Sequence, residues 1–169
     1  MTTAPLHRTW AQTHGHAALN PADAQPATPD EQRAAHDLLN RYALAYDELR
    51  PDLFVHYFTQ DAVVQTWLRD TKVAEFVGLD ALVAGVVSVM DEQGPAQRRH
   101  LVTNVVTHRV AGELRSVAYT AVFVSEDPSI VQAGATAVYS ATCTMIDGLW
   151  RIAHLTIGMD GYVGPPPRR

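Results

Sequence analysis

The spacing of hydrophobic residues changes along the chain. From Thr28 to Leu49 apolar residues fall three or four apart, which predicts one long amphipathic helix. Thr28, Pro29 and Glu31 have the order of a capping box with proline in the first turn, so the helix is expected to begin there. The segment 51–58 opens with proline and predicts a short second helix.

The pattern then alternates. A strand pair is predicted from DAVVQTWL and VAEFVG, followed by a third helix over 79–92. Four long strands are expected in HLVTNVVTHRV, LRSVAYTAVFV, QAGATAVYSATCTMID and LWRIAHLTIG. Helices followed by long strands indicate an α+β domain, in which a strongly bent antiparallel sheet wraps as a cone around the N-terminal helices.

Both ends of the chain lack such a pattern. Residues 1–29 are rich in Ala, Pro, Thr and His, so they predict a tail that is flexible or drapes over a neighbour. Residues 161–169 are rich in proline and predict an extended second tail. The folded domain is therefore expected over 30–160.

Composition excludes several classes of protein. The chain has 169 residues, a net charge of −5 and 47% hydrophobic residues, which fits one globular domain and disfavours nucleic acid as a partner. No apolar run reaches the roughly 20 residues of a membrane span, and no secretory signal is visible, so we expect a cytoplasmic protein. Cys143 is the single cysteine, which excludes an intramolecular disulfide. Without ligand-spaced histidines or a glycine-rich phosphate loop, neither a metal nor a cofactor is predicted.

Candidate chemistry lies in two distant segments. Tyr46 and Asp47 stand near the end of the first helix, and His100 stands in RRHLVTNVVTH. A carboxylate that holds one imidazole nitrogen leaves the other free as a base, provided that the fold brings them together. Asp47 would orient and His100 would act, while Tyr46 or Tyr42 would hydrogen-bond a developing enolate oxygen.

The order of elements resembles the nuclear-transport-factor-2-like (NTF2-like, or cystatin-like) superfamily, in particular its SnoaL-like branch. That branch is similar to scytalone dehydratase, bile-acid dehydratases and small polyketide cyclases. The segments that carry the resemblance, within residues 30–160, are YALAYDELRPDLFVHYFTQDAVV, RRHLVTNVV and GLWRIAHLTI. It implies that Tyr46 and Asp47 match the Tyr-Asp pair of scytalone dehydratase and that His100 matches its histidine. Tyr42 stands where the bile-acid dehydratases carry a catalytic tyrosine.

The rest of the expected pocket follows from strand positions. Asn104 shares strand parity with His100, so both are expected to point into the cone. His154 on the last strand is a third polar candidate whose direction the sequence leaves open. Substrate is expected to contact a mostly apolar and aromatic lining that includes Trp67, Phe76, Val102, Tyr119 and Met145.

The function predicted first is a cofactor-independent lyase or isomerase, of dehydratase or cyclase type. Its substrate would be a hydrophobic oxygenated molecule, such as a polyketide, steroid or terpenoid intermediate of secondary metabolism. One alternative is a small-ligand binding protein without chemistry; another is a structural small subunit like that of ring-hydroxylating dioxygenases. Each of these residues also has a purely structural interpretation, in which the two tyrosines pack in the core, Asn104 satisfies strand backbone and His154 lies at the surface. The last strands carry apolar residues at both odd and even positions, so the outer face of the sheet is apolar as well as the inner one. We therefore expect a homodimer or homotrimer that covers the outer face.

Overall fold

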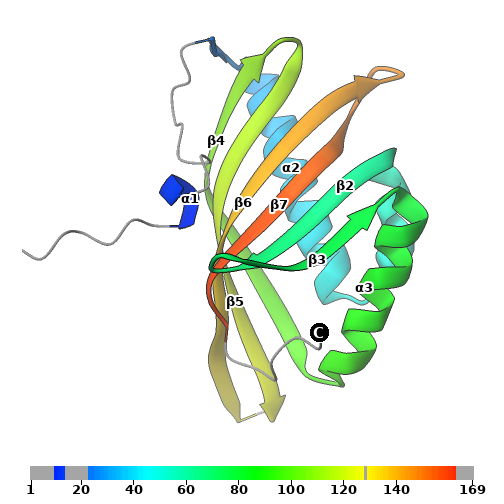
Figure 1. Ribbon diagram of the computed structural model, residues 1–169, viewed down its shortest axis with the longest axis vertical. Helices are drawn as coiled ribbons and strands as arrows, with labels where there is room; N and C mark the ends of the chain where they lie inside the picture. Colours follow the sequence, from blue (N-terminus) through cyan, green and yellow to red (C-terminus); the bar gives the residue numbers. More distant parts are fainter. Residues whose placement is uncertain (1–9, 14–22, 128, 163–169) are drawn as a thin grey trace, which may run out of the picture.

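A computed structural model describes residues 10–13, 23–127 and 129–162, which form an α+β domain (Figure 1). The helices are α1 (Trp10–Thr13), α2 (Pro29–Asp47), the 3-10 helix η1 (Pro51–His56) and α3 (Leu79–Gln93). The strands are β1 (Gln25–Pro26), β2 (Phe58–Leu68), β3 (Thr71–Val77), β4 (Gln97–Val110), β5 (Glu113–Asp127), β6 (Ile130–Ile146) and β7 (Leu149–Tyr162). The predicted helices and strands between residues 28 and 162 are confirmed, the second helix as a single 3-10 segment.

The described strands form one sheet in the order β1-β4-β5-β6-β7-β2-β3. The sheet is open and strongly curved, and α2 lies on its inner face with α3 beside β3 (Figure 1). The predicted bent sheet around N-terminal helices is confirmed. One pairing differs from the antiparallel prediction: β7 returns beside β2 in the same direction, so these two strands are parallel.

Helix α2 begins at the predicted capping box. The Thr28 hydroxyl accepts a hydrogen bond from the Glu31 amide, and the Glu31 carboxylate accepts one from the Thr28 amide at 2.9 Å. The other Glu31 oxygen forms an ion pair with Arg109 of β4. The start of α2 is thereby tied to the sheet, which sets the position of its far end.

The core lies between α2, η1 and the inner face of the sheet. At its centre the Tyr42 ring contacts Phe54, Phe58 and Tyr139, with centroids 5.5, 5.6 and 6.0 Å away. All four side chains are buried. Such contacts between rings stabilise the core beyond the burial of their area.

Part of the segment predicted as an N-terminal tail packs on the domain. Trp10 is buried on the outer face of the sheet, where its indole nitrogen donates to the Arg69 carbonyl at 2.9 Å. Its ring lies so close to Gly158 that a Cβ there would be 2.1 Å away. Strand β1 also pairs with β4. The prediction of a tail is therefore wrong for 10–13 and for β1.

The remainder of both predicted tails, apart from residues 23–29 and 161–162, lies outside the described residues. In the described part of the chain, no helix combines the length and apolar character that a membrane span requires.

Candidate functional site

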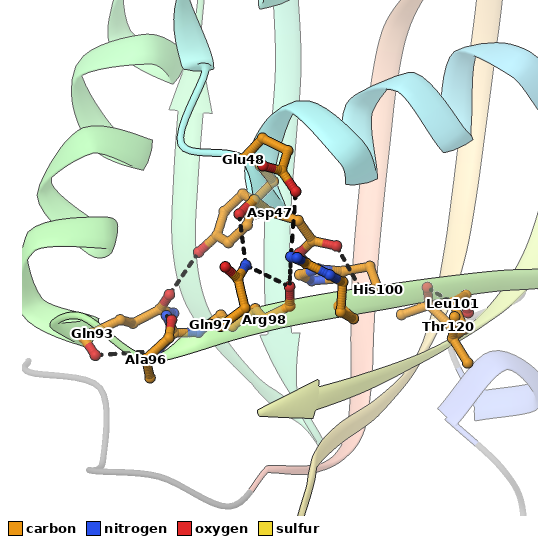
Figure 2. Close-up of polar contacts among 11 residues, drawn as sticks. Asp47, Glu48, Gln93, Ala96, Gln97, Arg98, His100, Leu101 and Thr120 are labelled. Carbon is orange, nitrogen blue, oxygen red and sulfur yellow. Dashed lines mark hydrogen bonds and ion pairs between the residues drawn. The ribbon is translucent and has the colours of Figure 1, made fainter. Parts of the chain in front are cut away.

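The C-terminal end of α2 meets β4 at a buried carboxylate. Asp47 Oδ1 lies 2.5 Å from Nδ1 of His100, and Asp47 Oδ2 accepts the backbone N–H of His100 at 2.7 Å (Figure 2). Their side chains are only 5% and 12% exposed. A carboxylate at the C-terminal end of a helix is unfavourable, because it lies at the negative end of the helix dipole. Its contact with a tertiary partner compensates for this. The fold thus brings together the two residues that the sequence placed far apart.

This contact also explains how the edge of β4 is satisfied. The His100 amide points away from β5 and would otherwise be an unpaired donor on a strand edge. Two further contacts join the same elements. The Gln97 side-chain amide donates to the Asp47 carbonyl at 3.2 Å, and Arg99 lies 3.4 Å from the Glu48 carboxylate (Figure 2). The dyad is therefore held by backbone as well as side-chain contacts.

The imidazole of His100 has one occupied and one available nitrogen. Nδ1 is held by Asp47, whereas no hydrogen bond joins Nε2 to the residues that the structure describes. The Tyr46 ring lies edge-on to the imidazole, with centroids 5.2 Å apart. Packing on one side and a bidentate carboxylate on the other fix the orientation of the ring.

Tyr46 adds a phenol beside the dyad. Its hydroxyl donates to Gln93 Oε1 at 3.1 Å, which links the end of α2 to the end of α3. Burial raises the pKa of the Tyr46 phenol, and the Gln93 contact and the Arg98 charge oppose that rise only in part. The phenol is therefore protonated at neutral pH and can donate a hydrogen bond. A cavity of about 60 Å³ lies against Tyr46, Asp47 and the loop that follows α3.

Tyr42 lies deeper than Tyr46. Its ring is part of the aromatic core, one turn of α2 away from the dyad, and is 6.4 Å from the Tyr46 ring. Burial raises the pKa of the Tyr42 phenol well above its usual value. Tyr42 therefore has the surroundings of a residue that packs the hydrophobic core.

The predicted lining divides between the two faces of the sheet. Phe76 and Val102 are partly buried and pack against the main core, so they lie on the inner side of the sheet. Trp67 instead packs with Trp10 on the outer face. The reason is strand parity: Val64 faces the core, so a side chain three residues later on β2 points the opposite way.

Two other predicted lining residues are exposed. Tyr119 is 56% exposed, because its neighbour Ala118 occupies the inward position on β5. Met145 has the inward parity of Cys143, but it lies near the end of β6 and is 47% exposed. Neither is brought to the dyad, which corrects their placement in the pocket.

The predicted polar partners of His100 are also not assembled. Asn104 has φ of +54° at a bulge where β4 loses register with β5, so the shared parity with His100 is broken and its side chain is exposed. His154 is exposed on the outer face, because Leu155 takes the core position. The expectation that Asn104 points into the cone is therefore wrong.

Three polar residues near the dyad were not predicted, namely Gln93, Gln97 and Arg98. Arg98 donates to the carbonyls of Gln93 and Ala96 at 3.2 and 3.0 Å (Figure 2). The one sequence signal was the arginine pair directly before His100, because arginine side chains commonly bind helix-end carbonyls. Among the described residues, no group of three or more His, Cys, Asp or Glu side chains could hold a metal ion.

Comparison with known proteins identifies the family to which this domain belongs. Residues 28–156 match the family model of the SnoaL-like domain, and the chain belongs to that family. Among curated proteins, none matches the sequence.

Solved structures share the fold at low sequence identity. Aln2 from a Streptomyces species has a TM-score of 0.71 at 18% identity, with 80% of this chain and 95% of that chain covered. The beta subunit assigned to an aromatic-ring-hydroxylating dioxygenase of Novosphingobium aromaticivorans has a TM-score of 0.68 at 20% identity, with coverage of 78% and 90%. An NTF2-like protein with a cystatin-like fold from Novosphingobium aromaticivorans has a TM-score of 0.62 at 12% identity, with coverage of 77% and 82%. These similarities establish the NTF2-like, cystatin-like fold.

Proposed function

We propose that this SnoaL-like protein is a cofactor-independent lyase or isomerase that acts on a hydrophobic oxygenated small molecule. The observation that carries the proposal is the Asp47–His100 pair, in which one carboxylate binds both the ring and the backbone of a nearly buried histidine. A catalytic base needs both its tautomer and its direction fixed, and this double contact would fix both.

The proposed chemistry begins with removal of a proton. Nε2 of His100 takes the proton from the carbon next to a substrate carbonyl, while Asp47 stabilises the imidazolium that forms. The carbonyl carbon–oxygen bond gains single-bond character, and the Tyr46 hydroxyl hydrogen-bonds the resulting enolate oxygen. The enolate then re-forms its carbonyl and expels a β-hydroxyl group, which leaves as water with the proton from His100.

The same intermediate permits other outcomes. Reprotonation at another carbon gives an isomer, and attack on a carbonyl within the same molecule gives a ring. The resemblance to dehydratases and polyketide cyclases supports this reaction class. Substrate placement would decide among the outcomes, and Phe76 and Val102 are the predicted lining residues that keep an inward position.

A second candidate function is a supporting subunit. The likeness to a dioxygenase beta subunit favours it. In that role the Asp47–His100 contact would anchor α2 to β4, and no turnover by the isolated protein would be expected. A homodimer or homotrimer stays a prediction; outward-facing Leu101, Tyr119 and Phe123 are exposed apolar residues that such a contact could cover.

The proposal is tested with the aldol adduct of benzaldehyde and acetone, a hydrophobic β-hydroxy ketone. Its dehydration gives a conjugated enone that is followed by ultraviolet absorbance. Wild-type protein is expected to accelerate enone formation, and His36→Ala, which removes an exposed histidine, should match it. A wild-type protein inactive on this and related β-hydroxy ketones would favour the subunit role.

The two tyrosines are expected to behave differently in this assay. Tyr46→Phe should lower kcat by about 10²-fold, because a donor to the enolate oxygen is lost. Tyr42→Phe should keep kcat within about twofold, because a core hydroxyl makes no contact with the reacting atoms. Rates of enone formation at saturating adduct check both values. If Tyr42→Phe lowered kcat more than Tyr46→Phe, Tyr42 would be the donor and the site would lie deeper in the core.

A further inference from the structure

The last residue of α3 contacts the proposed donor of the site. The Gln93 side chain is half-buried, and its Oε1 lies 3.1 Å from the Tyr46 hydroxyl oxygen. Among the described residues, Gln93 is the hydrogen-bond partner of the Tyr46 hydroxyl. This hydrogen bond joins the ends of α2 and α3. It involves the same Tyr46 side chain whose ring packs against His100.

The backbone of Gln93 is itself held in place. Arg98 donates Nη2–H to the Gln93 carbonyl and Nη1–H to the Ala96 carbonyl (Figure 2). Arg98 shares the face of β4 with His100, since both are partly buried while Arg99 between them is exposed. Gly94 turns the chain at φ of +67°. The strand that carries the base therefore also fixes the residue that contacts the phenol.

A carboxamide can play either role in this contact. With Oε1 toward Tyr46, the phenol hydrogen is used on Gln93 and is not available to a substrate. After a half-turn of the amide, Nε2–H donates to the phenol oxygen, and the phenol hydrogen is free to bind a substrate oxygen. The two orientations occupy the same space, so the switch needs no movement of the backbone.

We propose that Gln93 is a positioning residue that holds the Tyr46 hydroxyl in the free protein and, by turning its amide, donates to that hydroxyl when Tyr46 binds the substrate oxygen. The role in catalysis rests on the proposed function; the contact with Tyr46 does not. Ionisation of Tyr46 would require the same turn of the amide, because only Nε2–H can stabilise a phenolate oxygen. Burial raises the pKa of the Tyr46 phenol, and the Gln93 hydrogen bond is the largest influence that lowers it.

The first test needs no substrate. Protein that carries fluorotyrosine at position 46 alone is titrated by fluorine NMR. Fluorination lowers the pKa of this phenol while Tyr42 and Tyr139 keep theirs, so the titration falls in a range where the protein stays folded. Gln93→Leu keeps the size of the side chain but removes both hydrogen-bonding groups, so the midpoint of the Tyr46 titration is expected to move to higher pH.

Gln97→Leu is the matched control. Gln97 is also a glutamine at the same small cavity, but its amide donates to the Asp47 and Arg98 carbonyls. It should leave the Tyr46 midpoint unchanged. A Gln93→Leu protein whose Tyr46 titrates like wild type, or a Gln97→Leu protein with the same shift, would overturn the proposal.

The second test uses turnover of the benzaldehyde–acetone adduct. Gln93→Leu is expected to lower kcat by about 10- to 100-fold with little change in KM, because the donor is misplaced and substrate binding is kept. Gln93→Glu should lose more activity near neutral pH and recover toward wild type on acidification, since only the protonated carboxyl can donate. An unchanged kcat in Gln93→Leu would overturn the role in catalysis.

The two tests separate the two hypotheses. If Gln93→Leu shifts the Tyr46 titration while no variant of His100 affects turnover, the contact stands and the proposed reaction fails. If His100 is required for turnover while Gln93→Leu changes neither the titration nor kcat, the proposed reaction stands and the positioning role fails.

Discussion

Asp47→Asn is expected to lower kcat for the aldol adduct by roughly 10³- to 10⁴-fold. The two Asp47 oxygens face two donors of His100, the ring nitrogen and the backbone amide. An asparagine has only one oxygen, so its NH₂ group must face one of these donors. If the ring loses its acceptor, Nδ1 becomes the acceptor and Nε2 carries the hydrogen, and the proposed base is no longer available.

His100→Ala should cause a loss of similar size, and the double variant should lose little more. Residues that act as one unit give effects that do not add. Glu48→Gln is the matched control, because Glu48 neighbours Asp47 but its carboxylate lies beside the exposed Arg99. Circular dichroism would verify that each variant is folded. Additive losses in the double variant, or an active His100→Ala protein, would contradict a catalytic dyad.

The second large effect is expected at alkaline pH. Burial raises the pKa of Tyr42 and of Tyr139 far above that of a tyrosine in the unfolded chain, about 10. Each phenol therefore binds its proton more tightly in the native state. The stability that this difference provides is complete below pH ~10 and is lost as the pH rises through the native values. Each phenol contributes a slope of about 1.4 kcal/mol per pH unit.

Two such phenols give about 2.8 kcal/mol per pH unit, so a stability at the low end of roughly 5–15 kcal/mol is exhausted about two units above pH ~10. Tyrosinate absorbance and far-UV circular dichroism are expected to change together in this range. Tyr139→Phe should move the unfolding transition to higher pH. Complete ionisation of all tyrosines in a protein with native dichroism would refute this account.

The sequence predicted the elements well because each has a simple period. The apolar stripe from Ala35 to Leu49 predicted α2, and the capping box at Thr28 predicted its start. The pairing of Asp47 with His100 was predictable only through the family resemblance. No local pattern states that a helix end meets a strand more than 50 residues later, because that contact depends on how the whole sheet curves.

The errors came from features that act over one or two residues. Parity placed Asn104 beside His100, but a single bulge reverses which side chains face inward. Asparagine tolerates positive φ, which was the available signal. Parity also could not say which face of β5 or β7 is the inner one, so Tyr119 was misplaced and the direction of His154 stayed open. Gln93 had no signal, since its role depends on two helix ends that meet in space.

The parallel pairing of β2 with β7 has a consequence for synthesis of the protein. Phe58 pairs with Ile152, so 94 residues (152 − 58) must follow before this partner exists. At about 5–20 residues per second that interval is roughly 5–20 s. During it, one edge of β2 and the aromatic core beneath it have no β7 to cover them, whereas the segment that carries Asp47 has already been made and the segment that carries His100 is made before the interval ends. The ribosome thus produces the parts of the candidate site well before the chain can seal the hydrophobic core beside it.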